Sequence, residues 1–263
     1  MFNYSFRLGL EEKLRLFREY GFEYIHWCDD WDNDALYSIE EISRFKQSIS
    51  DSGLVCQDVH GTSTPKYSID SIDPQGRRGY HDLLENRVIL CSELGGDCVV
   101  AHPPRTEGGE LGVKLANSIE ALGSLQSICR DRGVRLAVEN CYRGDEFFLD
   151  GFLNRFEPDF LGICFDSGHA NIHGNLDSIL RRGERLIATH LHDNMGDSDS
   201  HQPPFWGTVD WRKVMDRIKA SGYRKPLNLE DTYYVGVSEG SIREFLSVSQ
   251  SAAERLLRMS IVL

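Results

Sequence analysis

The chain has 263 residues, of which 40% are hydrophobic and 10% aromatic, enough for the core of one large α/β domain. Its 29 basic and 41 acidic residues give a net charge of −12, which argues against a general nucleic-acid binder because phosphate backbones are held by basic surfaces. No apolar run approaches the roughly 20 residues of a membrane span, so we expect no membrane partner. The first residues lack a secretory signal, and the seven cysteines form no CxxC pair, so we expect a cytoplasmic protein.

Short apolar runs alternate with longer amphipathic stretches along the chain. The runs that we predict as strands are, in order, Phe6–Leu8, Tyr24–Cys28, Val55–His60, Cys98–His102, Leu136–Glu139, Leu161–Asp166, Ile187–Leu191 and Leu227–Glu230. Helical spacing of apolar residues appears in residues 11–21, 85–96, 115–133 and 211–222, and glycine closes each stretch. Eight strands alternating with helices predict a (β/α)8 TIM barrel that residues 1–263 form as a single domain. An open doubly wound sheet is the alternative, but no GxGxxG follows the first strand.

Histidine and carboxylate side chains follow the ends of the predicted strands. Six of them close a strand: His60, His102, Glu139, Asp166, His190 and Glu230. They are 24 to 42 residues apart, about one strand–helix unit, so a barrel would bring them to one face. Three more, His169, Asp199 and His201, lie in the loops that follow. Neutral imidazoles and ionised carboxylates suit Zn, Mn or Co, and an oxygen-rich subset suits Mg, so the pattern predicts a divalent-metal centre.

Each of these residues also has an ordinary structural explanation. A histidine at a strand end often only hydrogen-bonds to a loop, and Asp166 with His169 would be suitable to cap the following helix. Glu139 and Glu230 are harder to explain in this way, because a carboxylate at the end of an apolar strand is costly to desolvate without a cation or hydrogen bonds. The agreement of all nine positions, more than any single residue, indicates a metal site.

Other side chains near the strand ends are candidates for binding a substrate. His192 shares a strand face with His190, so we expect it to line the pocket or to support the ligands. Arg105 and Arg143 are the basic residues nearest to the site in the sequence, and they are suited to a phosphate or carboxylate, although loop salt bridges explain them equally well. Trp206 is one of several loop aromatics that would form an apolar wall of the pocket or pack on the barrel rim.

Several motifs of the chain resemble those of the xylose-isomerase-like TIM-barrel superfamily. They are HPP at 102–104, VEN at 138–140, FDSGHA at 165–170, HLHDN at 190–194 and DSH at 199–201. This superfamily includes sugar-phosphate isomerases and epimerases, inosose dehydratase, and the endonucleases of family 2 that cut DNA at abasic sites. The motifs specify the superfamily better than they specify the substrate.

The resemblance implies two ligand sets. Ketose epimerases hold one metal with a Glu, an Asp, a His and a Glu, which match Glu139, Asp166, His190 and Glu230. The abasic-site endonucleases hold three zinc ions with further residues, which match His60, His102, His169, Asp199 and His201. One to three divalent ions (Zn, Mn, Co or Mg) are therefore implied, and the ligand inventory alone leans toward a polynuclear centre. At the second strand end, where many sugar isomerases have Glu, this chain has His26, so the resemblance leaves the sugar undefined.

The function we expect is a metal-dependent isomerase or epimerase of a small sugar or sugar phosphate. Glu139 and Glu230 would exchange a proton through a metal-bound enediolate. Asp166 and His190 would fix the metal, and His169 would hold a substrate oxygen. The alternatives are a zinc-dependent phosphodiesterase acting at abasic sites, an inosose-dehydratase-like lyase, and a non-catalytic barrel that keeps its metal. Assembly into a homo-oligomer is left open.

Overall fold

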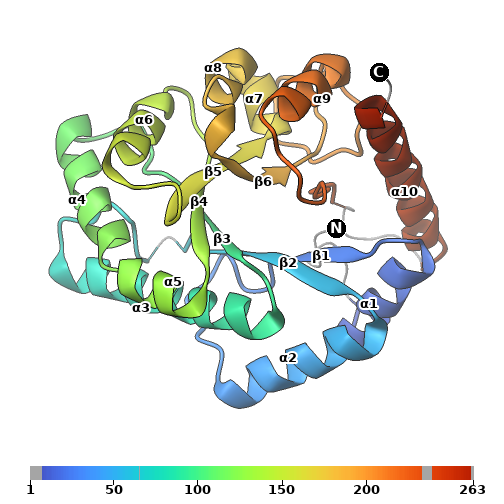
Figure 1. Cartoon of the computed structure of the whole chain (residues 1–263), viewed down its shortest axis with the longest axis horizontal. Helices are drawn as coiled ribbons and strands as arrows, with labels where there is room; N and C mark the ends of the chain where they lie inside the picture. Colours follow the sequence, from blue (N-terminus) through green and yellow to red (C-terminus); the bar gives the residue numbers. More distant parts are fainter. Residues whose placement is uncertain (1–7, 65, 233–238, 262–263) are drawn as a thin grey trace.

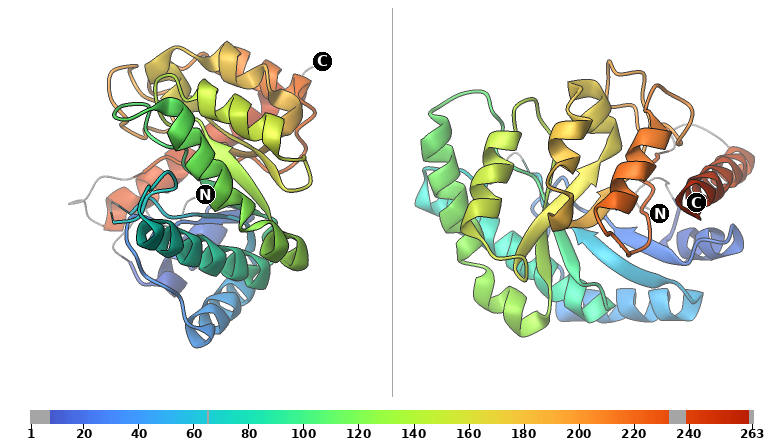
Figure 2. Two further views of the ribbon diagram at one scale, coloured as in Figure 1. Left: turned by 90° about the vertical axis from the view of Figure 1, so that its left-hand side faces the viewer. Right: turned by 45° about the horizontal axis from the view of Figure 1, so that its top comes forward.

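A curved parallel sheet lies at the centre of the molecule, and the helices lie around its outside (Figures 1 and 2). The computed structural model describes residues 8–64, 66–232 and 239–261. The strands are β1 Tyr24–Trp27, β2 Val55–His60, β3 Cys98–Ala101, β4 Arg135–Glu139, β5 Leu161–Asp166 and β6 Leu186–His190. They pair in chain order, and all of the pairs are parallel. This is the arrangement expected when each strand is followed by a helix that returns the chain to the same edge.

The helices connect these strands. They are α1 Leu10–Glu19, α2 Ile39–Ser52, α3 Pro74–Leu94, α4 Leu111–Gly123, α5 Gln126–Arg132, α6 Glu146–Arg155, α7 Ser167–His173, α8 Leu176–Leu180, the 3₁₀ helix η1 Gly183–Arg185, α9 Trp211–Ala220 and α10 Glu239–Ile261. Among the described residues, no helix combines the length and the apolar character that crossing a membrane would require.

The predicted strands agree with the structure except at the two ends of the chain. The second to seventh runs correspond to β1 to β6, with bounds that differ by one residue at most. The first run, Phe6–Leu8, lies almost wholly outside the described residues. The last run, Leu227–Glu230, is not a regular strand but one parallel bridge between Leu229 and Leu191, just beyond β6. Pro226 has no N–H to donate, which limits the ladder at this point. Six strands of the predicted eight are therefore seen in the described part of the chain.

The helix predicted over residues 115–133 is interrupted. It forms α4 and α5, which are separated near Gly123 and Ser124, two residues with weak helix propensity. The glycines predicted to end helices do so: Gly21, Gly95, Gly133 and Gly222 all have φ between 66° and 87°, the left-handed region that favours glycine.

The two faces of the sheet carry different side chains. Large apolar residues such as Val99, Val138 and Phe165 face the helices and belong to the main core. The opposite face has a separate cluster of mostly small residues: Cys98, Val100, Ala137, Cys164, Ile187 and Ala188. Successive residues of a strand alternate between the faces, so the residue two positions after such an inward residue also points inward. Glu139 follows Ala137 in this way, and His190 follows Ala188.

A polar contact inside the curved sheet joins its first strands to the segment after α9. The carboxylate of Asp58 is fully buried, and it lies 2.7 Å from Nδ1 of His26. Nδ2 of Asn228 donates to both oxygens of this carboxylate, at 2.8 and 3.1 Å. The contact therefore holds residues 226–230 against β2, next to the place where Glu230 enters the site.

We predict that Asn228→Ala lowers the free energy of unfolding by about 2–3 kcal/mol, because it removes a donor from a buried carboxylate. Urea denaturation would measure the loss. Gln47→Ala is the matched control, since Gln47 makes the same amide–carboxylate bond to Asp51 on the exposed face of α2. Similar small losses in both variants would show that the Asp58 contact does not stabilise the fold.

Candidate metal centre

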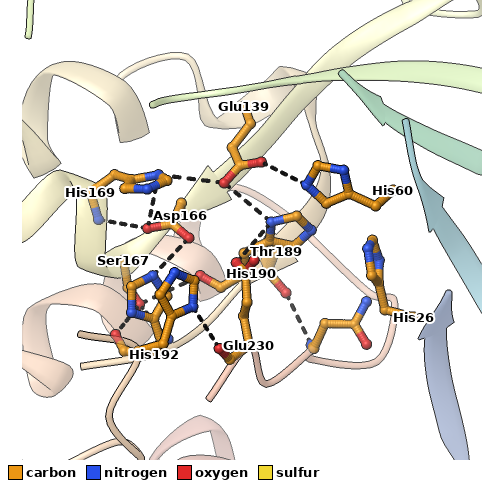
Figure 3. A network of polar contacts seen from close by, with 12 residues as sticks. His26, His60, Glu139, Asp166, Ser167, His169, Thr189, His190, His192 and Glu230 are labelled. Atoms are coloured by element: carbon orange, nitrogen blue, oxygen red, sulfur yellow. Dashed lines mark hydrogen bonds and ion pairs between the residues drawn. The ribbon is translucent and has the colours of Figure 1, made fainter. Parts of the chain in front are cut away.

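Four predicted ligands meet at the carboxyl ends of the strands (Figure 3). The ligand atoms of Glu139, Asp166, His190 and Glu230 all lie within 4.8 Å of one another. Nδ1 of His190 is 3.2 Å from Oε1 of Glu139 and 3.1 Å from Oε2 of Glu230. Donor atoms around a metal with bonds of about 2.1 Å are separated by roughly 3.0–3.4 Å. The spacing and the chemistry of this quartet therefore fit one divalent ion.

The strand register produces this arrangement. Asp166 is the last residue of β5, His190 is the last residue of β6, and the two are paired across the sheet. Glu139 is the last residue of β4, and Glu230 follows the bridge that extends β6. Because parallel strands end at one edge, residues from four segments reach the same space.

The second oxygen of Glu139 faces another pair of imidazoles. Its Oε2 is 3.4 Å from Nε2 of His102 and 4.0 Å from Nε2 of His60. His102, Glu139 and Cys141 form a further group whose ligand atoms lie within 4.8 Å of one another. Glu139 therefore lies between two sets of donors, as a carboxylate shared by two ions would.

The remaining predicted ligands form a third group around Asp199. Its Oδ2 is 3.3 Å from Nε2 of His169 and 3.1 Å from Nε2 of His201. Nδ1 of His169 lies 3.0 Å from the carbonyl of Asn140, and Nδ1 of His201 lies 2.8 Å from the carbonyl of Glu230. Since a carbonyl only accepts, each Nδ1 carries the hydrogen, which is the pattern of histidines that bind metal through the other nitrogen. All nine predicted ligands thus lie in one connected cluster.

The electrostatics of the cluster favour a cation. Burial alone would raise the pKa of Glu139, but the imidazoles of His190 and His102 hold that pKa well below its ordinary value. Burial also opposes the charge on Glu230, and His190 and His201 keep its pKa low. For His201 the effects are reversed: burial opposes the positive charge, but the carboxylates of Asp199 and Glu230 outweigh burial and raise the pKa of His201 to about 9. The buried carboxylates are therefore ionised and need positive charge, which protons on the imidazoles or a metal would supply.

The predicted substrate-binding residues lie in different surroundings. His192 is fully buried, with Nε2 3.1 Å from Oδ2 of Asp166, so it packs behind the ligands. Arg105 lines a cavity beside His102. Arg143 is exposed on the loop after β4, and Trp206, 60% exposed, lies on the loop after β6. Their roles in binding remain predictions.

Some residues of the site were not predicted from the sequence. Ser167 Oγ donates to the backbone carbonyl of His192 at 2.7 Å and accepts from the backbone N–H of His192 at 3.0 Å. These two bonds fix the chain just after β6. Asp58 supports His26 inside the sheet. Asp58 precedes His60 by two residues and so shares its strand face, a signal that would have been sufficient to find it.

The fold and the cluster define an α/β protein whose curved parallel sheet gathers metal-type side chains at the carboxyl ends of its strands. Residues 14–251 match the family described as Xylose isomerase-like TIM barrel, and the chain belongs to this family. The prediction of the superfamily is thereby confirmed.

Individual proteins are similar to this chain over most of its length. An uncharacterised protein of Sinorhizobium fredii, y4fM, is 32% identical over 84% of this chain and 81% of its own length. The D-psicose 3-epimerase of Ruminiclostridium cellulolyticum is 20% identical over 91% of this chain and 92% of its own. A crystal structure of a D-tagatose 3-epimerase-like protein superposes with a TM-score of 0.79 at 20% identity, covering 98% of this chain and 95% of that one. The structural likeness shows that the two proteins share the same fold.

We predict that a divalent ion at about a hundred times its Kd raises the free energy of unfolding by about 2.7 kcal/mol, because it binds only the folded cluster. Thermal melting with Zn, Mn, Co or Mg would measure this gain. Glu139→Gln should lose most of it, since Glu139 contacts donors of every group. Glu93→Gln, which changes an exposed ion pair on α3, is the control. An undiminished gain in Glu139→Gln would contradict the assignment of the cluster as the metal site.

Asp145 gives a pH-dependent prediction. Its buried carboxylate accepts from the N–H groups of Cys141 and Tyr142, but burial raises its pKa to about 6. A raised pKa in the folded state means that protonation of Asp145 stabilises the folded protein relative to the unfolded chain. This stabilisation is complete below the ordinary pKa of 3.8 and is lost as the pH rises through about 6. Relative to Asp145→Asn, the wild type should therefore lose up to about 3 kcal/mol between pH 4 and pH 7. Urea denaturation over this range tests it, with the exposed Asp131→Asn as control; parallel curves for wild type and Asp145→Asn would refute it.

Proposed function

We propose that the chain is a metal-dependent isomerase or epimerase of a small sugar. The observation that carries the proposal is that Glu139 and Glu230 approach the same nitrogen of His190, at 3.2 and 3.1 Å, from separate segments of the barrel. Two ionised carboxylates thus border one space. Removing a proton from one face of a carbon and returning one to the opposite face needs two groups, a carboxylate that accepts the proton and a protonated carboxyl group that delivers one.

The quartet of Glu139, Asp166, His190 and Glu230 would hold the ion, which when bound polarises the carbonyl of the sugar and makes the neighbouring C–H more acidic. One of the two glutamates removes the proton of that C–H. The other, which must carry a proton when the sugar is bound, delivers that proton to the opposite face in an epimerisation, or to the adjacent carbon in an isomerisation. His169, whose ring is fixed by the carbonyl of Asn140, would hold a substrate oxygen. The D-psicose 3-epimerase relative supports this class of reaction.

A second candidate is supported by the donors outside the quartet. His60 and His102 face one side of Glu139, and the group of His169, Asp199 and His201 provides donors for a further ion. A zinc-dependent phosphodiesterase acting at abasic sites would use several ions of this kind. The net charge of −12 weighs against a DNA substrate. An inosose-dehydratase-like lyase would begin with the same proton abstraction, so it is a variant of the first proposal.

Proton exchange in D₂O tests the proposed chemistry directly. Metal-loaded protein incubated with ketopentoses and ketohexoses should place deuterium at the carbon beside the carbonyl and form a second sugar. Glu139→Gln and Glu230→Gln should each slow this exchange by about a hundredfold to ten-thousandfold, the usual contribution of a general acid or base. Glu184→Gln, in η1, is the control.

Elemental analysis of the same samples distinguishes loss of metal from loss of a proton-transfer group. Near-normal exchange in both glutamate variants would refute the mechanism. Two or three zinc ions per chain together with nicking of an abasic oligonucleotide would favour the phosphodiesterase.

A further inference from the structure

The two oxygens of the Glu139 carboxylate face different surroundings (Figure 3). Oε1 lies 3.2 Å from Nδ1 of His190 and 3.5 Å from Nδ1 of His169, on the side of the predicted quartet. Oε2 lies 3.4 Å from Nε2 of His102 and 4.0 Å from Nε2 of His60. Although Glu139 is only 1% exposed, its Oε2 has no hydrogen-bond partner among the residues that the structure describes. A carboxylate oxygen buried in this way is costly unless a cation or a donor reaches it.

A thiol completes a second set of donors around this oxygen. Cys141 follows Glu139 by two residues, and one ligand atom from each of His102, Glu139 and Cys141 lies within 4.8 Å of the other two. The thiol is also within hydrogen-bonding contact of the imidazoles of His102 and His169. Zinc binds sulfur at about 2.3 Å and nitrogen or oxygen at about 2.0–2.2 Å, so the ligand atoms of one zinc ion are roughly 3.3–3.7 Å apart. The group is compact enough to meet this requirement.

The surroundings of Cys141 differ from those of most other cysteines in the chain. Five of the seven belong to the apolar clusters of the described core, where a thiol acts as a small hydrophobic group: Cys56, Cys91, Cys98, Cys129 and Cys164. Cys141 is 6% exposed, yet it belongs to neither cluster. Its thiol is buried beside imidazoles and a carboxylate, an environment that suits a metal ligand better than it suits apolar packing.

The backbone of Cys141 is fixed on both sides. Its N–H donates to Oδ2 of Asp145 at 2.6 Å, and the N–H of Tyr142 donates to the same oxygen at 2.9 Å. Its carbonyl lies 3.2 Å from Nε2 of His173 in α7, and this nitrogen carries the hydrogen because a carbonyl only accepts. The loop after β4 thereby holds the thiol next to Glu139, so little ordering is needed when an ion binds.

The donors on the two sides of Glu139 suit different ions. The predicted quartet has three carboxylates and one imidazole, an oxygen-rich set that is compatible with Mn or Mg as well as Zn. The second group contains one carboxylate, one imidazole and one thiol. Thiolate is a soft ligand that favours Zn and disfavours Mg and Mn. The two groups therefore differ in the metal they prefer, although they share Glu139.

We propose that His102, Oε2 of Glu139 and the thiolate of Cys141 form a second metal site that selects zinc and is joined to the quartet through the Glu139 carboxylate. The thiol releases its proton to solvent when the ion binds, since the thiolate is the form that coordinates metals. His60 is the nearest side chain for the fourth position of a tetrahedral ion. The proposal requires that the cluster is a metal centre, and it does not depend on the reaction proposed above.

Cobalt substitution tests for the thiolate ligand without requiring turnover. Cobalt(II) bound by a thiolate has an intense charge-transfer absorption in the near ultraviolet, which cobalt bound only by nitrogen and oxygen lacks. The full chain, stripped with a chelator and titrated with cobalt, should develop this absorption. Cys141→Ala and Cys141→Ser should lose it. Cys129→Ala is the matched control and should keep it, because Cys129 is buried among apolar residues in α5.

Competition between metals tests the selectivity. Each protein is dialysed against equal concentrations of zinc and manganese, and its metal content is then measured by elemental analysis. Wild type should retain about one zinc ion more per chain than Cys141→Ala does. The affinity for this ion should fall at least about a hundredfold in the variant, because losing a ligand costs more than losing a residue that only supports one. Urea denaturation of the metal-free proteins checks that the variants are folded.

Cys164 is the alternative source of a thiolate. Its thiol contacts the imidazole of His190, but among the described residues it belongs to no group of converging ligand atoms. We therefore expect Cys164→Ala to keep the cobalt absorption. Loss of the absorption in Cys164→Ala, with full absorption in Cys141→Ala, would assign the thiolate to the quartet and overturn the second site.

The outcomes also separate this inference from the proposed function. No cobalt–thiolate absorption in wild type, or the same zinc content in wild type and Cys141→Ala, would overturn the second site. Zinc binding that depends on Cys141, in a protein that exchanges no proton of any sugar, would support the second site and refute the isomerase chemistry. Proton exchange on a sugar by a protein that holds one ion and is indifferent to Cys141→Ala would do the reverse.

Discussion

The burial of the Glu139 carboxylate is the constraint on which the site depends. Glu139 is 1% exposed at the end of β4, where an ionised group without positive partners would strongly destabilise the fold. Its partners come from other segments: His102 follows β3, His190 ends β6, and His169 lies in α7. Each of these segments must therefore end within a few ångströms of the same point. The positions of the strand ends and the types of residue in the cluster both follow from the need to surround the buried Glu139 carboxylate with positively charged partners.

The interior of the curved sheet makes this arrangement compatible with a folded core. Below the ligands, the inward positions are occupied mainly by small residues such as Ala137, Cys164 and Ala188. The larger apolar residues of the same strands face the helices, where most of the hydrophobic burial takes place. The polar side chains at the strand ends thus take few positions that large apolar residues of the main core would otherwise occupy. The buried carboxylate of Asp58, inside the sheet, is nevertheless paired with His26 and Asn228.

Much of this site was accessible from the sequence, because strand-end residues are fixed by two simple patterns. An apolar run locates the strand, and the two-residue period decides which side chain points inward, as for Glu139 and His190. Other features of the fold were not predicted from the sequence. The break between α4 and α5 and the reduction of Leu227–Glu230 to a single bridge depend on local propensity and on Pro226. Gly79 lies within α3, and no sequence period indicates that its backbone packs against the Tyr67 ring in the loop that follows β2.

The close packing of the Tyr67–Ser71 loop on Gly76 and Gly79 has a consequence for how this barrel changes over evolutionary time. The cavity beside His102 is bordered in part by this loop and by α3, whereas the predicted ligands are carried by strand ends, by α7 and by the loop after β6. Substitutions in α3 that reshape the wall would leave the carboxylates and imidazoles where they are. The shape of this cavity can therefore change among descendants of this chain while the cluster of predicted ligands stays the same.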